Sequence, residues 1–193
     1  KKVAVMLDGG HVRVYTKKAG YRYDPNYIEK IAHACVLSNE QIYRVLYYDA
    51  LRTRGVQLSD FWQEAQFYGS DTWLHELAHK DYFAVRLGTI KFRGYVPKHS
   101  PIGTGQPQDS DFNPSFEQKG VDMRIGLDMA IFAGSRAVDV IALATNDTDC
   151  IPAMKHARRS GLQVALVEFA NCKPCKELLA HTDFRRGITW PAP

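Results

Sequence analysis

Residues 3 to 10 read VAVMLDGG, an apolar run that ends in an aspartate and two glycines. Residues 140 to 149 read VIALATNDTD, in which a second apolar run gives way to polar residues and two aspartates. A short, continuous apolar run followed by turn residues is typical of a strand buried on both faces, as in a parallel sheet. The two stretches therefore predict buried parallel strands whose carboxyl ends carry acids.

Strand and helix patterns alternate along the rest of the chain. We expect strands at residues 3–7, 41–48, 84–92, 138–144 and 162–167, and helices at residues 25–37, 59–80, 120–132, 149–160 and 174–181. Repeated strand-helix alternation is typical of a sheet covered by helices on both faces. The expected fold class is α/β, a three-layer α/β/α sandwich with a mostly parallel central sheet of the Rossmann-like kind.

The length of 193 residues suits one domain, and we find neither a linker nor an internal repeat, so residues 1–193 are expected to form a single domain. Residues 94–118 are rich in Gly, Pro, Ser, Asp and Gln without apolar periodicity, which predicts a long irregular loop. No apolar run approaches the roughly 20 residues that span a bilayer, so we expect no membrane partner. We see no signal peptide, although Lys1 suggests that the native start is missing or replaced.

The four cysteines are too few and too unevenly spaced for the disulfide framework of a secreted domain, which favours the reducing cytoplasm. Cys172 and Cys175 form a CxPC stretch after an apolar run, as in thioredoxins. Only 18 residues follow Cys175, too few to complete a thioredoxin domain. Half of a zinc site is a second alternative, and two small apolar side chains at a helix end are the simplest interpretation.

Acids at three distant places in the chain are the main candidates for a functional site: Asp8, Asp122, and Asp147 with Asp149. Ligands of parallel sheets gather at the carboxyl ends of the strands, so these side chains can meet there. Clustered carboxylates repel one another unless a cation lies among them. The sequence therefore predicts a divalent-metal site, although each aspartate could instead cap a helix or a turn.

Four stretches of the chain resemble the NYN domains of the LabA/DUF88-like branch, within the PIN-like nuclease superfamily. They are VMLDGG at residues 5–10, YYDA at residues 47–50, QKGVD at residues 118–122 with Asp128, and TNDTD at residues 145–149. The resemblance implies a PIN-like α/β/α sandwich whose acids bind Mg²⁺ or Mn²⁺ and cut RNA. Family members commonly carry Asn three residues after the first aspartate, whereas this chain has His11.

We expect Asp8, Asp122, Asp147 and Asp149 to be the metal ligands and, with Lys119 and Thr145, the catalytic residues. Lys119 could place an ammonium group on the scissile phosphate, and Thr145 could bond a metal water or a phosphate. A solvated lysine and a hydroxyl bonded to backbone are the plainer alternatives. His11, Asp49, Asp128 and Asn146 are expected beside the site or in structural roles. Asp128 cannot share a close metal with Asp122, because six helical residues rotate a side chain by about 240° and advance it by about 9 Å.

Basic and aromatic residues are interleaved in the middle of the chain, and the net charge of +4 is compatible with a polyanionic partner. Cations meet phosphates while rings stack on bases, so this mixture suits a single nucleic-acid strand. We expect RNA contacts from Arg52, Lys91, Arg93 and Tyr95. A solvated surface with core aromatics is the alternative.

The sequence favours a cytoplasmic, Mg²⁺- or Mn²⁺-dependent ribonuclease that hydrolyses phosphodiester bonds in single-stranded or unpaired RNA. The alternative is a non-catalytic NYN module that binds RNA or a protein partner. Besides RNA, a second copy of the chain in a homodimer is a possible partner. A haloacid-dehalogenase-like phosphatase is disfavoured, because Gly10 stands where its second aspartate would be needed.

Overall fold

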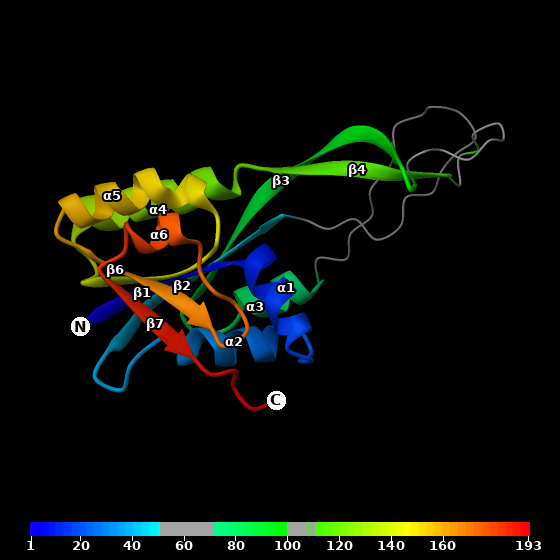
Figure 1. Ribbon diagram of the computed structural model, residues 1–193. Helices are drawn as coiled ribbons and strands as arrows, with labels where there is room; N and C mark the ends of the chain where they lie inside the picture. The colour runs from blue at the N-terminus through cyan, green and yellow to red at the C-terminus, as the bar shows by residue number, and fades with distance from the viewer. Residues whose placement is uncertain (51–71, 100–107, 109–110) are drawn as a thin grey trace.

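A computed structural model describes residues 1–50, 72–99, 108 and 111–193, and Figure 1 shows the arrangement of its elements. In this part of the chain, strands form one sheet in the order β4-β3-β2-β1-β5-β6-β7. The parallel strands are β1 (Lys2–Asp8), β2 (Gln41–Ala50), β3 (Phe83–Pro97), β5 (Val140–Ala144), β6 (Gln163–Phe169) and β7 (Phe184–Ile188). β4 (Phe112–Lys119) pairs antiparallel with β3 at one edge.

Helices cover both faces of the sheet, so the expected three-layer α/β/α sandwich is confirmed (Figure 1). One face packs against α1 (Gly9–Lys18), α2 (Pro25–Ala34) and α3 (Thr72–Ala78) through a core that includes Val12, Ile28 and Leu77. The other face packs against α4 (Val121–Ser135), α5 (Ile151–Arg159) and α6 (Lys176–Leu179) through a second core. None of the helices within the described ranges is long and apolar enough to cross a membrane.

The central strands follow directly from their composition. β1 and β5 are apolar along almost their whole length, and all five residues of β5 are buried. Their side chains alternate between the two cores: Val3, Val5 and Leu7 enter one, and Ala4 and Met6 enter the other. A strand covered on both faces needs no polar alternation, which explains the continuous apolar runs.

The prediction of an irregular loop at residues 94–118 is wrong at both ends of this range. β3 continues to Pro97, and β4 begins at Phe112, so the two strands form a hairpin that projects from the sandwich (Figure 1). Its register shifts between Phe92 and Tyr95, where Gly94 has a positive φ of 94°. Residues 94–118 lack the apolar alternation that identifies a half-buried strand, so the sequence did not indicate these parts of β3 and β4.

Two further elements were not expected from the sequence. α1 starts directly after β1, at two glycines that are weak helix formers, and β7 contains two arginines. Arg186 of β7 is nevertheless buried, because it donates to the Cys35 carbonyl at 2.7 Å and pairs with Glu40 at 2.8 Å. The helix expected at residues 174–181 is shorter in the structure and consists of α6 alone. For the long helix expected at residues 59–80, residues 59–71 lie outside the described residues.

Candidate metal centre

The chain builds its sheet outward from β1 in two directions. β2 and β3 lie on one side of β1, and β5, β6 and β7 lie on the other. The crevice between the carboxyl ends of β1 and β5 is therefore the topological switch point, where open parallel sheets commonly bind ligands. Asp8 ends β1, and Thr145 directly follows β5, so two of the expected site residues flank this crevice.

Three of the expected acids form a compact group beside the crevice. One carboxylate oxygen from each of Asp122, Asp147 and Asp149 lies within 4.8 Å of the other two. Asp122 comes from the first turn of α4, and the other two come from the segment after β5, which forms a short 3₁₀ helix, η2 (Thr148–Cys150). Two segments that are 25 or more positions apart in sequence thus bring their carboxylates together.

The turn after β5 is held by a chain of hydrogen bonds that starts at Asp8. The Thr145 hydroxyl donates to Asp8 Oδ2 at 2.9 Å and accepts from the Asp147 amide at 3.2 Å. Asp147 Oδ1 in turn accepts from the Asp149 amide at 2.9 Å and so caps η2. The Asp149 side chain caps neither η2 nor α5, and its carboxylate is exposed to solvent.

Asp8 lies outside the three-acid group and is joined to it through the Thr145 hydroxyl. Its Oδ1 accepts the amides of Gly10 at 3.0 Å and His11 at 3.2 Å, so that Asp8 caps α1. Burial raises the pKa of the Asp8 carboxyl, and repulsion from Asp147 adds to the increase, while the hydrogen bonds to its oxygens oppose it. Asp8 is not a member of the three-acid group, and its oxygens accept three hydrogen bonds, so its expected role as a metal ligand stays a prediction while its role in holding α1 and the turn after β5 is shown by these contacts.

Asp122 is brought to the group by a tight approach between β3 and the start of α4. Gly120 precedes the helix in a left-handed conformation with φ of 82°. A Cβ atom at Gly88 would lie 2.7 Å from the Lys119 carbonyl oxygen and 2.8 Å from a methyl group of Val121. Glycines at these two positions therefore let β4 turn sharply into α4 beside the crevice.

The electrostatics of the group are those of uncompensated negative charge. The pKa of Asp122 is raised, first by burial, then by the charges of Asp147, Asp8 and Asp149, and also by a hydrogen bond with Asp147. Burial and the same carboxylates raise the pKa of the nearby Cys150 thiol to about 12. Within the described residues, no lysine, arginine or histidine forms an ion pair with any of the three acids.

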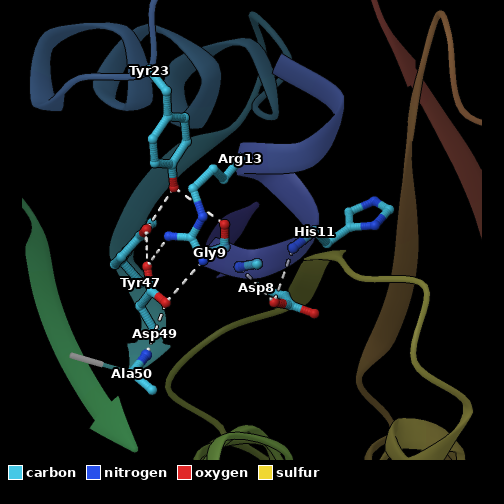
Figure 2. A network of polar contacts seen from close by, with 9 residues as sticks. Asp8, Gly9, His11, Arg13, Tyr23, Tyr47, Asp49 and Ala50 are labelled. Atoms are coloured by element: carbon cyan, nitrogen blue, oxygen red, sulfur yellow. Dashed lines mark hydrogen bonds and ion pairs between the residues drawn. The ribbon is translucent and has the colours of Figure 1, made fainter. Parts of the chain in front are cut away.

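Asp49, at the end of β2, lies in a separate buried network that Figure 2 shows. Arg13 of α1 donates two hydrogen bonds to the Asp49 carboxylate, at 2.6 and 3.2 Å, and the Tyr47 hydroxyl donates a third at 2.8 Å. The Tyr23 hydroxyl lies 2.5 Å from that of Tyr47 and reaches the Gly9 carbonyl at 3.3 Å. Asp49 therefore fixes α1 to the sheet and does not border the acid group.

His11 does not replace the polar Asn that the resemblance leads one to expect. Its ring packs between Tyr15 and Phe169, at centroid distances of 4.9 and 5.5 Å, and points away from the Asp8 carboxylate (Figure 2). Burial lowers the pKa of the imidazole to about 4, so the ring is neutral near pH 7. His11 therefore has a structural role, and its backbone amide donates a hydrogen bond to the Asp8 carboxylate.

Asp128 and Asn146 occupy structural positions. Asp128 is buried, accepts from the Tyr48 hydroxyl at 2.8 Å and pairs with Arg86 at 3.3 Å. This agrees with the helical geometry that separated it from Asp122. The Asn146 side chain accepts from the Cys175 amide at 2.7 Å, which ties the turn carrying Asp147 to the loop after β6.

The residues expected to bind RNA are not gathered at the acids. Lys119 ends β4 opposite Thr89 and is exposed close to the site, whereas Tyr95 lies six residues farther along the hairpin, about 20 Å away at 3.3 Å per residue. Arg93 is likewise exposed on this hairpin. Lys91 pairs through its backbone with Glu117, and Arg52 lies outside the described residues.

The cysteines give no support to the redox or zinc alternatives. Cys172 is buried, and the half-buried Cys175 thiol contacts the Glu177 carboxylate; both are free thiols. Over the described ranges, the acid group is the one set of three histidine, cysteine or acidic side chains close enough to share an ion.

Sequence reasoning missed the contribution of Arg13, Tyr23 and Tyr47, which set the position of α1 and hence of the Asp8 cap. Tyr47 belongs to an apolar strand and reads as core, and Arg13 falls in a segment without a predicted element. The sequence feature that could have indicated this contact is Gly9, because only glycine allows α1 to approach β2 so closely. A Cβ atom at Gly9 would collide with the Tyr47 hydroxyl and would lie 2.7 Å from the Tyr48 carbonyl oxygen.

No protein-family model matches the chain, and no curated protein matches its sequence. Among solved structures, the chain is similar to a protein of unknown function from Vibrio parahaemolyticus, with 16% sequence identity and a TM-score of 0.55. The alignment covers 97% of this chain and 93% of the Vibrio chain. At this level of identity the likeness extends to the fold, and it shows that the whole α/β/α architecture recurs in a second protein.

Proposed function

We propose that the protein is a Mg²⁺- or Mn²⁺-dependent ribonuclease of the cytoplasm, which hydrolyses phosphodiester bonds in single-stranded or unpaired RNA, as NYN and PIN-like proteins do. The observation that carries the proposal is the convergence of Asp122, Asp147 and Asp149 beside the switch point of the sheet. This convergence comes from two separate segments and exceeds what capping of η2 requires. The four free cysteines agree with a reducing compartment.

The chemistry of the three acids fits a hard dication. Carboxylate oxygens are the donors that Mg²⁺ and Mn²⁺ take in proteins. Burial raises the pKa of Asp122, repulsion from Asp147, Asp8 and Asp149 adds to the increase, and an ion would relieve that repulsion. A dication bound there would supply activation of a water molecule and neutralisation of charge on the phosphodiester.

The chain's own residues would hold and orient this centre. Asp122, Asp147 and Asp149 would bind the ion, while Thr145 and Asp8 fix the turn through the hydroxyl that joins them. Lys119 would meet a phosphate at the base of the hairpin, where an exposed ammonium stabilises developing negative charge. Arg93 and Tyr95 would bind RNA farther along the hairpin, through phosphate contacts and base stacking.

A non-catalytic module that binds RNA or a protein partner is the second candidate, and one observation favours it. The His11 ring is packed among aromatic side chains and gives nothing to the acid group, although the corresponding family position commonly carries Asn. If that Asn is essential for turnover, this chain would keep its binding surface without cleavage.

Cleavage of an unstructured RNA oligonucleotide in Mn²⁺ separates the two functions. We expect the wild-type chain to cut the RNA and Asp147→Asn to lose about a thousandfold in rate, because one ligand of the ion is lost. Asp81→Asn is the matched control: Asp81 is exposed between α3 and the amino end of β3, far from the acid group. Circular dichroism checks that each variant is folded.

Two outcomes would contradict the nuclease proposal. One is a wild-type chain that binds the RNA but leaves it intact in Mg²⁺ and Mn²⁺, which would support the module. The other is cleavage by Asp147→Asn at the rate of the Asp81→Asn control, which would point to a contaminating nuclease.

A further inference from the structure

We propose that the outer face of α4 is the contact surface of a homodimer with antiparallel α4 helices. Met123, Leu127 and Ile131 stand in one row on this face, with 70%, 57% and 62% of their surface exposed. The opposite side of the helix already supplies the core through Val121, Ile125 and Met129. A surface helix normally has one apolar stripe, so a second stripe on the solvent side indicates a partner.

A row of small residues lies beside the row of large ones. Gly126, Ala130 and Gly134 are also spaced four apart, next to Leu127 and Ile131 on the helix surface. Nothing described lies within 4 Å of a Cβ atom built on Gly134, and one built on Gly126 meets only the Ala153 side chain, at an ordinary 3.7 Å. The folded chain therefore gives no reason for glycine at either position, although glycine weakens a helix.

The two rows together make this face complementary to itself. Helices pack by placing the ridge of residues four apart from one helix into the groove beside the same kind of ridge on the other. The large row of one copy can lie in the small-residue groove of the second copy, and the second copy returns the contact. Such reciprocity is what a two-fold symmetric dimer requires, and it favours a second copy over an unrelated partner.

The net charges at the two ends of the face favour the antiparallel direction, with the exposed Arg124 in the first turn of α4 offsetting one of the three acids at that end. α4 and α5 run side by side and both begin near the acid group, where Asp149 is exposed. They end near Arg136 and Arg159, which are exposed and form no ion pair within the described residues. An antiparallel arrangement places the basic end of each copy over the acidic end of the other, whereas a parallel arrangement would stack like charges.

The area available indicates how tight the dimer is. The three exposed apolar side chains offer on the order of 200 Å² per copy, against about 800 Å² per partner in a standard interface. The contact must therefore extend over α5 and the charged ends, where area is more polar. We expect a reversible dimer with a dissociation constant in the micromolar range that weakens as salt is added.

Sedimentation velocity of the full chain over a series of concentrations tests the surface. We expect the wild-type chain to convert from monomer to dimer, and Leu127→Glu to weaken this association at least a hundredfold. Gly134→Leu should weaken it too, because it fills the groove while leaving the monomer helix intact. Leu37→Glu is the control: Leu37 is 51% exposed, follows α2 on the other side of the sheet, and should leave association unchanged.

Some results would overturn the proposal. They are a wild-type chain that stays monomeric throughout the concentration series, and a dimer that Leu127→Glu and Gly134→Leu leave intact while circular dichroism shows both variants folded. A monomer would mean that the face is bare, covered by another part of the chain, or meant for a different protein.

Cysteine cross-linking in a Cys175→Ser background tests the direction. Because Leu127 lies midway between Met123 and Ile131, an antiparallel pair brings Leu127 next to its own counterpart, so Leu127→Cys should form a cross-linked dimer. Met123→Cys and Ile131→Cys should cross-link when mixed and not when incubated singly. Self-cross-linking of Met123→Cys without the mixed product would refute the antiparallel geometry. The cross-linking is done on the metal-free chain, because a dication at the acid group would cancel the negative charge that favours the antiparallel direction. Association itself does not require RNA cleavage, so the dimer and the nuclease activity can fail separately.

Discussion

Asp49 in β2 and the acid group after β5 lie toward the carboxyl ends of parallel strands on either side of β1, yet their surroundings differ sharply. Asp49, near the end of β2, is 1% exposed and is neutralised by Arg13 at 2.6 Å, with two further hydrogen bonds from Tyr47 and from the Ala50 amide. Asp122, Asp147 and Asp149 are more open to solvent and have no described cation as a partner. The fold therefore compensates the acid that holds it together and leaves uncompensated the acids that we assign to a dication.

The largest expected effect concerns the compensated acid. Arg13→Met should lower the free energy of unfolding by about 3–5 kcal/mol, because it leaves the Asp49 charge buried without a partner. Urea unfolding followed by circular dichroism measures the loss. The matched control is Arg22→Met, whose ion pair with Asp24 at 3.2 Å involves a side chain that is 90% exposed, so the loss should stay below about 1 kcal/mol. Equal losses in the two variants would refute the contrast.

A dication should stabilise the folded chain, by about 2.7 kcal/mol at a hundred times its dissociation constant. The folded-state pKa values of Asp8 and Asp122 are raised above the ordinary 3.8, so the metal-free native state binds more protons than the unfolded state. Metal-free stability should consequently fall as the pH rises through those raised values, and the gain from Mn²⁺ should grow over the same range. Thermal unfolding with and without Mn²⁺ between pH 4 and 7 measures both trends, and a gain independent of pH would argue against carboxylate ligands.

Thr145 links Asp8 to the acid group, since its hydroxyl bridges the half-buried Asp8 carboxylate and the turn that carries Asp147. Thr145→Val keeps the shape of the side chain and removes both hydrogen bonds, so we expect a loss of about 1–2 kcal/mol in stability. Because the turn is no longer fixed, the affinity for Mn²⁺ should drop about 10- to 100-fold. Urea unfolding and isothermal titration calorimetry measure the two effects. Unchanged Mn²⁺ affinity would show that the bridge does not order the ligands.

The smallest expected effect has the opposite sign. Asp149→Asn removes one of the mutually repelling charges, so the metal-free protein should gain about 0.5 kcal/mol. The gain should shrink in high salt, because exposed charges are screened. A loss of stability in the metal-free protein would mean that the Asp149 charge has a favourable partner after all.

The fold was predictable where strands are buried on both faces. The apolar runs of β1, β5 and β6 identified the parallel sheet, and the helical spacing of Ile28 and Ile31 identified α2. The part of β3 beyond Phe92, β4, α1 and β7 were missed because their structure does not follow from local apolar periodicity. Arg186, for example, is buried only because Glu40 and the Cys35 carbonyl, distant in sequence, come to meet it.

The site was predictable in outline, because acids that follow buried strands converge at one edge of a parallel sheet. That principle brought Asp122, Asp147 and Asp149 together. It could not show that the Asp8 oxygens accept hydrogen bonds from the α1 amides and from Thr145. Nor could it show that Arg13 neutralises Asp49, or that the His11 ring packs in an aromatic cluster. Each of these depends on α1, whose glycine start concealed the helix.

A crystal of the protein soaked in Mn²⁺ tests the central claim most directly, through the anomalous density of the ion. We predict a peak within about 2.0–2.4 Å of carboxylate oxygens from Asp122, Asp147 and Asp149, which disappears in Asp147→Asn crystals. A well-ordered acid group with no peak at millimolar Mn²⁺, or a peak elsewhere on the molecule, would contradict the assignment of these three acids to a dication.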